Sequence, residues 1–184
     1  MKEFFDIIRK AFGNLSQKQV DGFVVLKTAS DNLPLEHAAY VLATAFHETA
    51  HTMQPIYEKG RKAYFKKYDG RKSLGNTEPG DGFKFRGRGY VQVTGRANYS
   101  KFKKLLNADL ISNPDLALDP VVASKIITLG MRDGLFTGKK MSDFKSYEAM
   151  RRVVNGTDRA ALIAGYATTM EKALQANEDA ATLY

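Results

Sequence analysis

Apolar residues recur at helical spacing along most of this chain. The first such pattern, Phe4, Phe5, Ile7, Ile8 and Phe12, predicts a short amphipathic helix. The same spacing predicts a second helix that begins near residue 16. It also predicts helices over about residues 34–53, 97–106, 120–131, 142–154 and 157–177. The pattern therefore favours a mainly α-helical fold.

Residues typical of helix starts support this assignment. Ser16 and Gln19 have the spacing of a capping box, in which each side chain bonds the backbone N–H of the other residue. Pro34 suits the first turn of the third predicted helix, because its ring fixes a helical φ and the missing N–H has no partner there anyway. Both signals place helix starts where the apolar period begins.

Two stretches lack the helical period. Residues 59–84 hold five glycines, Pro79 and many basic residues, and they predict a long irregular loop. Residues 87–94 mix glycine with the β-formers Tyr90, Val91 and Val93, and they predict a short β-hairpin strand or extended element. Loops as long as the first stretch are usually functional in a compact domain.

Length and composition narrow the class of protein. A chain of 184 residues without a repeat or a linker predicts one domain over residues 1–184. The absence of cysteine excludes disulfide scaffolds, thiol catalysis and cysteine-ligated metals. The first residues do not resemble a secretory signal peptide, and no apolar stretch reaches the length of a membrane span.

Positive charge is concentrated in one segment. Residues 59–104, the basic segment, hold 14 Lys and Arg against three acids, a net charge of +11, whereas the whole chain carries +8. The segment is either an ordinary solvated surface or a site of attraction to a polyanion such as nucleic acid, a lipid surface or an acidic cell-wall polymer. The chain has no recognisable reading helix or aromatic stacking platform, which argues against nucleic acid.

One short motif predicts metal chemistry. The letters HETAH at residues 47–51 fit the zinc-peptidase pattern H-E-x-x-H. Four residues apart on a helix, His47 and His51 would lie on one face and share a zinc ion, with Glu48 as general base. The alternative for His51 is an ordinary histidine near the end of a helix.

A zinc site also needs a third ligand. The remaining histidine, His37, lies two to three turns upstream on the same predicted helix, too far along it to complete the site. Glu58 or Glu78 would have to serve instead. This requirement weakens the zinc interpretation, because five letters with two free positions also arise by chance.

Glu48 has a second interpretation as a carboxylic acid. It follows Ala45 by three residues and Val41 by seven, at the margin of the apolar stripe. A partly desolvated acid there is suited to donate a proton near neutral pH. Glycoside hydrolysis needs such an acid and a second carboxylate across the scissile bond. Glu58, ten residues later at the start of the basic segment's loop, is a candidate for that second group.

A longer motif resembles a known family. Residues 85–94, FRGRGYVQVT, follow the His-Glu-Thr of residues 47–49 and precede Asn98-Tyr99. This run is similar to the F-x-G-R-G-x-x-Q-[LV]-[ST] signature of glycoside hydrolase family 19, which includes plant-type chitinases and related bacteriophage endolysins. Residues 153–156, VVNG, resemble the second site element of that family. The resemblance spans about residues 35–170 and implies a lysozyme-like fold with its small β element beside an active-site cleft.

The resemblance implies roles for individual residues. Glu48 is expected to be the general acid of an inverting mechanism and Glu58 the general base, with Glu78 as the alternative base. Thr94 falls where the family positions the nucleophilic water. Inversion needs room for that water, so the two carboxyl groups are expected roughly 6.5–9.5 Å apart.

Further residues are expected to bind the sugar or to orient the site. These are Gln92, Asn98, Tyr99 and Asn155. Arg88 is expected to be buried beside the two acids and to hold their carboxylates by bidentate bonds. The flanking glycines let the backbone approach the cleft closely.

Departures from the plant enzymes shape the functional expectation. Plant-type chitinases are usually longer, secreted and disulfide-bonded, whereas this chain is short, cysteine-free and without a signal. These differences favour a peptidoglycan-degrading endolysin, a lysozyme-like glycosidase that causes cell lysis and uses no metal or organic cofactor. We expect a monomeric catalytic domain without a separate wall-binding domain, made in the host cytoplasm and released by a separate pore-forming protein. A chitinase of the same family and a zinc peptidase remain the alternatives.

Overall fold

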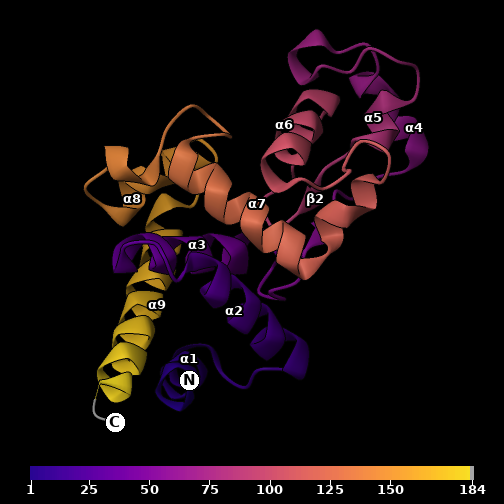
Figure 1. The fold of residues 1–184 in the computed structure, drawn as a ribbon. Coiled ribbons are helices and arrows are strands. Elements are labelled where there is room, and N and C mark those ends of the chain that lie inside the picture. The colour runs from indigo at the N-terminus through magenta and orange to yellow at the C-terminus, as the bar shows by residue number, and fades with distance from the viewer. Residues whose placement is uncertain (183–184) are drawn as a thin grey trace. The chain divides into compact units, whose positions relative to one another are not determined.

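The chain folds into two compact units. The computed structural model describes residues 1–182. They divide into unit 1, formed by residues 1–53 with the chain from residue 127 onward, and unit 2, formed by residues 54–126. Figure 1 colours the ribbon by residue number, so the segments of each unit can be followed along the chain. Most residues are helical and one small antiparallel sheet is present, which confirms the predicted mainly α fold class.

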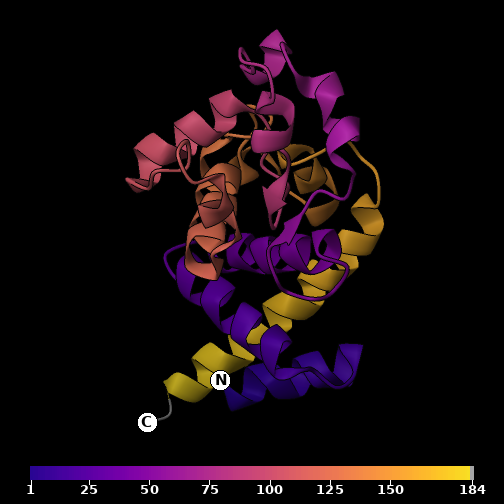
Figure 2. The same ribbon diagram turned by 90° about the vertical axis from the view of Figure 1, so that its right-hand side faces the viewer.

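Helices make up most of unit 1. They are α1 (Lys2–Phe12), α2 (Gln17–Ser30), α3 (Leu35–Glu48), the end of α7 (Pro120–Asp133), α8 (Tyr147–Met150) and α9 (Ala160–Ala181), with 3-10 turns η4 (Met141–Asp143) and η5 (Arg151–Val153). Helix α3 packs against α2 and α9, and α9 also packs against α1 and α8. Figures 1 and 2 both show α9 running beside α3. Helix α3 therefore lies at the centre of unit 1.

The amino acids of α3 explain this central place. Every residue from 38 to 46 is buried, and nearly all of them are apolar. A helix that is apolar on all sides is stable only when other elements surround it. Near its end, Phe46 packs against the rings of Phe12, Phe23 and Tyr166. This packing fixes the position of the last residue of the helix, Glu48.

The start of α2 confirms the predicted capping box. The Gln19 N–H donates to Ser16 Oγ (3.3 Å), and the Ser16 N–H donates to Gln19 Oε1 (2.9 Å). The helix then packs tightly on the turn after α3: a Cβ added at Gly22 would lie 2.0 Å from the Met53 carbonyl oxygen. Gln19 Nε2 also donates to the His51 carbonyl (2.9 Å). Helix α2 thus holds the segment that follows α3.

Helix α3 is shorter than predicted. It ends at Glu48 rather than near residue 53, and Ala50, His51 and Met53 have φ of 50°, 69° and 56°. The Thr49 hydroxyl explains the early end, because it donates to the Ala45 carbonyl (2.7 Å) and accepts from the Met53 N–H (3.1 Å). A side chain that offers the backbone such partners competes with continuation of the helix.

Unit 2 contains the sheet and several short helices. The strands β1 (Ile56–Tyr57) and β2 (Arg88–Gly89) pair antiparallel, with Ile56 opposite Gly89 and Tyr57 opposite Arg88. This confirms the predicted extended element. The helices are α4 (Lys62–Phe65), η1 (Lys66–Tyr68), η2 (Lys72–Leu74), α5 (Asp81–Lys84), α6 (Arg96–Leu106), η3 (Pro114–Leu118) and the first part of α7. Residues 59–84 were predicted to be irregular, and this prediction is wrong: they form four short helical segments.

Polar anchors hold residues 59–84 in place. The buried Asp81 carboxylate accepts from the N–H groups of Thr77 and Glu78 and, at 2.6 and 2.8 Å, from the guanidinium of Arg96. Asp69 accepts from the N–H groups at the start of α5. Burial alone would raise the pKa of Asp81, but these donors outweigh it and hold that pKa below its ordinary value. Ionised side chains therefore stabilise a segment that has few apolar residues.

The C-terminal helices also differ in detail from the prediction. Residues 142–154 were expected to form one helix, but they form η4, α8 and η5 with a break before Ser146, whose hydroxyl accepts from the Ala149 N–H. Helix α9 starts at Ala160 rather than 157, because Arg159 has a left-handed φ of 58°. Among residues 1–182, none of the helices combines the length and the apolar character needed to span a membrane.

Candidate active site

Glu48 ends α3 and is held by a buried arginine. Its Oε1 accepts from Arg151 Nη1 at 2.6 Å, and Arg151 Nε donates to the Asp158 carbonyl at 2.9 Å. The Arg151 side chain is 3% exposed, whereas that of Glu48 is 23% exposed. An Arg–carboxylate bond of this length is charge-assisted and fixes the orientation of both groups. Glu48 therefore presents a fixed carboxylate that solvent, and hence a substrate, can reach.

Sequence reasoning missed Arg151. It assigned the buried arginine beside the acids to Arg88, but Arg88 Nε bonds Asp115 at 2.8 Å and its Nη1 bonds the Lys84 and Arg86 carbonyls. The predicted bidentate bonds from Arg88 to the two glutamates are therefore wrong. The available signal was the position of Arg151 two residues before the Val-Val-Asn-Gly motif.

Two neutral side chains neighbour Glu48. Burial lowers the pKa of His47 below its ordinary value and raises the pKa of Tyr40 above its own. Both groups are thus uncharged at neutral pH, and each interacts electrostatically with Glu48 and Arg151. The charged groups that act on His47 at this end of α3 are the ion pair of Glu48 and Arg151, with Arg159 and Asp158 as smaller contributors.

The geometry contradicts the zinc interpretation. His51 lies beyond the end of α3 with a positive φ, so it does not share a helical face with His47. Its ring stacks on Phe46, with centroids 4.1 Å apart, and its Nε2 lies at hydrogen-bond distance from the Tyr166 hydroxyl (3.2 Å). Within residues 1–182, no group of three or more potential metal ligands comes together. His51 is a packing residue.

Glu58 lies in unit 2, directly after β1, and both oxygens of its carboxylate accept hydrogen bonds. Its Oε2 accepts from the Gly87 N–H (3.1 Å) and its Oε1 from the Tyr68 hydroxyl (3.3 Å), while its own N–H donates to the Gly87 carbonyl (2.7 Å). Gly87 needs to be glycine, because an added Cβ would lie 3.0 Å from Glu58 Cβ and 2.8 Å from Gln92 Oε1. The Gly-Arg-Gly run thus holds the Glu58 carboxylate against its backbone.

Glu78, the alternative base, has different surroundings. It is exposed at the start of α5, where its N–H donates to Asp81 and its carboxylate accepts from the neighbouring Thr77 hydroxyl at 3.4 Å. Its backbone N–H is therefore one of the groups that bond Asp81 at the start of α5. Of the two candidates, Glu58 is the one bonded to the Gly-Arg-Gly run.

Gln92, Thr94 and Asn98 form a chain of hydrogen bonds beside Glu58. Gln92 Nε2 donates to the Ile56 carbonyl (2.9 Å) and so links its turn to β1. The Thr94 hydroxyl donates to the Gln92 carbonyl (3.0 Å), and Asn98 Nδ2 donates to the Thr94 carbonyl (2.8 Å). All three side chains are half-buried. They hold the turn that follows β2, and their roles in the site stay predictions.

Tyr99 bonds the arginine of the Gly-Arg-Gly run and the backbone of the residue before that run. It is fully buried, donates to the Arg86 carbonyl (2.8 Å) and accepts from Arg88 Nη1 (2.9 Å), and burial raises the pKa of Tyr99 to about 12. A direct contact of Tyr99 with sugar is therefore not part of its role. Arg88 and Tyr99 together stabilise the backbone that bonds Glu58.

Asn155 lines an open pocket in unit 1. The pocket has a volume of about 590 Å³ and is also bordered by Thr137, Arg152 and Thr157. Asn155 Oδ1 accepts from the next N–H, that of Gly156, at 2.9 Å, and the side chain is exposed. Asn155 and Arg151 are close in sequence, so the pocket begins within one turn of the arginine that holds Glu48.

Comparisons with known proteins agree with the family resemblance in sequence. No family model matches the chain. Over 91 residues the chain is 31% identical to a glycosyl hydrolase family 19 domain-containing protein of Haemophilus influenzae, a match that covers 48% of this chain and 42% of that protein. The chain thus matches about two fifths of the length of this curated relative.

Solved structures agree with it in fold. Chitinase C from Streptomyces griseus HUT6037 matches 95% of this chain and 75% of its own, with a TM-score of 0.67 and 18% identity. A bacterial family 19 chitinase matches 95% of this chain and 92% of its own, with a TM-score of 0.62 and 21% identity. The fold is therefore the lysozyme-like fold of family 19 chitinases, and the resemblance to that family is confirmed.

Proposed function

We propose that this chain, which has the fold of the family 19 chitinases, is a glycoside hydrolase that cleaves β-1,4 bonds in the glycan strands of peptidoglycan. The observation that carries the proposal is Glu48, a partly exposed carboxylate fixed by buried Arg151 at the end of the central helix of that fold. A fixed, accessible carboxylic acid is the group that protonates a leaving glycosidic oxygen.

In this mechanism Glu48 is the general acid and Glu58 the general base. The Arg151 bond uses Oε1 of Glu48, so Oε2 is the oxygen that carries the transferred proton. Glu58 removes a proton from the attacking water, and Thr94 orients that water. Each carboxylate oxygen has two lone pairs, so the bonds to Gly87 and Tyr68 still leave Glu58 able to accept from water. Attack on the opposite face of the sugar gives inversion.

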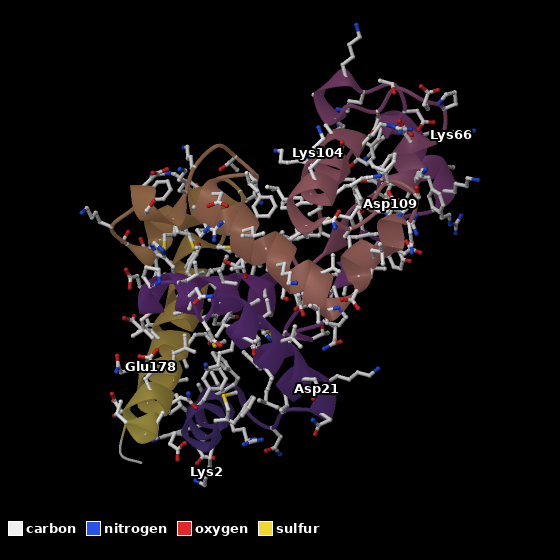
Figure 3. The ribbon with its side chains drawn as sticks, in the orientation of Figure 1. Lys2, Asp21, Lys66, Lys104, Asp109 and Glu178 are labelled. Atoms are coloured by element: carbon white, nitrogen blue, oxygen red, sulfur yellow. The ribbon has the colours of Figure 1, made fainter. Side chains whose placement is uncertain are left out.

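The basic segment supports peptidoglycan as the substrate. It carries a net charge of +11, and exposed lysines such as Lys66 and Lys104 extend from unit 2 into solvent (Figure 3). Such a surface attracts anionic cell-wall or outer-membrane polymers, whereas chitin is neutral. We therefore propose an endolysin, active as a monomer, that reaches the wall through a separate pore-forming protein and lyses the cell.

Chitin hydrolysis is the second candidate. Both solved structures described above are chitinases, and they share the fold of this chain over most of its length. Chitin and peptidoglycan contain the same β-1,4 linkage, so the same two carboxylates would act on either. Initial rates on chitin oligosaccharides and on purified peptidoglycan, measured side by side, decide between the two substrates.

The Glu48→Gln variant tests the proposal. We expect it to keep the wild-type circular dichroism spectrum and to release reducing sugar ends from peptidoglycan roughly 10²- to 10⁴-fold more slowly. Glu36→Gln, an exposed change on the same helix, is the matched control and should retain wild-type rates. Mass spectrometry of the released fragments identifies the sugar at the new end. A Glu48→Gln rate within tenfold of wild type would remove the central claim.

A further inference from the structure

The second hydrogen-bond donor to Glu58 comes from a segment outside the family motif. Tyr68, in η1, donates its hydroxyl to Glu58 Oε1 at 3.3 Å, while the Gly87 N–H bonds Oε2. With one donor on each oxygen, the carboxylate cannot rotate without breaking a bond. Gly87 belongs to the Gly-Arg-Gly run, but Tyr68 lies in the stretch that sequence patterns describe as irregular.

The surroundings of Tyr68 fix its position closely. Buried Asn76 donates from Nδ2 to the Tyr68 carbonyl (2.9 Å) and accepts at Oδ1 from the Arg96 N–H (2.9 Å). Asp69, the next residue, accepts from the Gly82 N–H at 2.7 Å. A Cβ at Gly82 would lie 2.1 Å from the Phe65 carbonyl and 3.0 Å from Tyr68 Cβ, so α5 and η1 pack in direct contact. Asn76 and the packing of α5 against α4 and η1 thus hold the backbone of Tyr68 at a defined place.

We propose that Tyr68 is a positioning residue for the general base, which holds the Glu58 carboxylate in the orientation that accepts a proton from the attacking water. This inference rests on the proposed role of Glu58. The hydroxyl bond is stronger to the ionised carboxylate than to the protonated acid, so Tyr68 favours the form of Glu58 that is ready to act.

The protonation state of Tyr68 suits this role. Burial, chiefly, then a hydrogen bond with Tyr64 and the nearby negative charge of Glu58 raise the pKa of Tyr68, so its hydroxyl keeps its proton at neutral pH. Tyr64, which packs edge-on against Tyr68, differs: a hydrogen bond from Lys67 lowers the pKa of Tyr64. Lys67 lies over both rings, at 3.5 Å and 4.9 Å from their centroids.

Two arginines also lie over the Tyr57 ring of β1. Arg86 donates from Nη1 to the Phe83 carbonyl, and Arg88 of β2 is paired through Nε with Asp115. The residues of α4 and η1 that interact electrostatically with Glu58 are Tyr64 and Tyr68, and Lys67 lies over the rings of both. Of these residues, only Tyr68 donates a hydrogen bond to the carboxylate. Removal of its hydroxyl therefore tests that bond separately from the electrostatic effect of the other residues.

The test is Tyr68→Phe, with Tyr64→Phe as the matched control. Both variants lose one hydroxyl from neighbouring rings of the same segment, but only the first loses a bond to Glu58. For Tyr68→Phe we expect kcat on solubilised peptidoglycan to fall about tenfold with KM changed less than about twofold. Its pH–rate profile should also differ from that of wild type, because the Tyr68 hydroxyl bonds an ionised carboxylate more strongly than a protonated one. Tyr64→Phe keeps the bond from Tyr68 to Glu58, so its kcat and its profile should stay much closer to those of wild type.

Glu58→Gln, measured in parallel, separates the two levels of the inference. An active Glu58→Gln enzyme means that the base itself is assigned wrongly, which overturns the proposed role of Glu58. If Glu58→Gln is inactive while Tyr68→Phe has the kcat and the pH profile of wild type, only the positioning role of Tyr68 is wrong. A Tyr68→Phe enzyme that is slower and less heat-stable, but keeps the wild-type pH profile, would show a purely structural tyrosine and would also overturn it.

Discussion

Replacement of Arg151 by methionine removes the charge that holds Glu48 while keeping a long apolar side chain in its place. The guanidinium is 3% exposed and makes two bonds, to Glu48 Oε1 at 2.6 Å and to the Asp158 carbonyl at 2.9 Å. Methionine fills much of the same volume but donates no hydrogen bond. The Arg151→Met variant thus leaves the end of α3 packed, with Glu48 no longer fixed.

The size of the effect follows from these contacts. Removal of one partner of a buried ion pair costs about 3–5 kcal/mol, but the 23% exposure of Glu48 lets water replace part of the lost bond. Loss of the Asp158 bond adds about 1 kcal/mol. We therefore expect the free energy of unfolding to fall by about 2–3 kcal/mol, which lowers Tm by roughly 5–10 °C for a chain of this size. A carboxylate displaced by about 1 Å loses roughly 10²-fold in kcat.

Thermal unfolding and initial rates on peptidoglycan measure the two effects on the same sample. Arg132→Met is the matched control in unit 1, because Arg132 is half-exposed and pairs only with the adjacent Asp133. An exposed pair of this kind contributes about 0–1 kcal/mol, so this variant should keep its Tm within about 3 °C and its full activity. If Arg151→Met behaves like Arg132→Met in both assays, the argument that Arg151 positions Glu48 is refuted.

Two further predictions concern residues away from the catalytic bonds. His51→Ala removes a ring that stacks on Phe46, so it should lower the free energy of unfolding by about 1 kcal/mol. The hydrolysis rate should stay unchanged, with or without a metal chelator. A rate abolished by the variant or by the chelator would restore the metal hypothesis. Asp81→Asn breaks the bond pair to Arg96 and should destabilise the chain by about 2 kcal/mol at pH 7. The pKa of Asp81 in the folded state lies below its ordinary value of 3.8, so its stabilisation is full above that pH and is lost as the pH falls below it. The Tm difference between wild type and Asp81→Asn should therefore shrink below about pH 4, and a difference that persists at pH 2 would contradict the ionic account.

Local signals in the sequence were sufficient for much of the fold. The capping box of Ser16 and Gln19 forms as predicted, and the apolar period places α1, α6 and α7 to within a few residues. These elements depend on neighbours that are close in sequence or on one continuous apolar face. The position of Glu48 at the end of the buried face of α3 follows from the same pattern.

Contacts between distant residues explain what the sequence could not predict. The bond between Arg151 and Glu48 joins residues 103 positions apart, and no periodic pattern marks its buried arginine.

The early end of α3 depends on one local contact. The Thr49 hydroxyl competes for backbone partners, and the spacing of apolar residues does not reveal this competition. The zinc interpretation failed for this reason, since it required the helix to continue through His51.

The stretch 59–84 shows why glycine and charge, taken alone, predicted an irregular loop. Three of its five glycines, Gly60, Gly75 and Gly82, are sites of close approach, and Gly82 lets α5 lie against η1. Two of the three acids in the basic segment, Asp69 and Asp81, bond the backbone of that segment, so they act as the internal ties that apolar residues provide elsewhere. Because these carboxylates hold the backbone of residues 59–84, the lysines and arginines of this stretch remain exposed. The stretch still holds Tyr68 at a fixed position. The same stretch therefore presents positive charge to solvent and holds Tyr68 against Glu58, the proposed base.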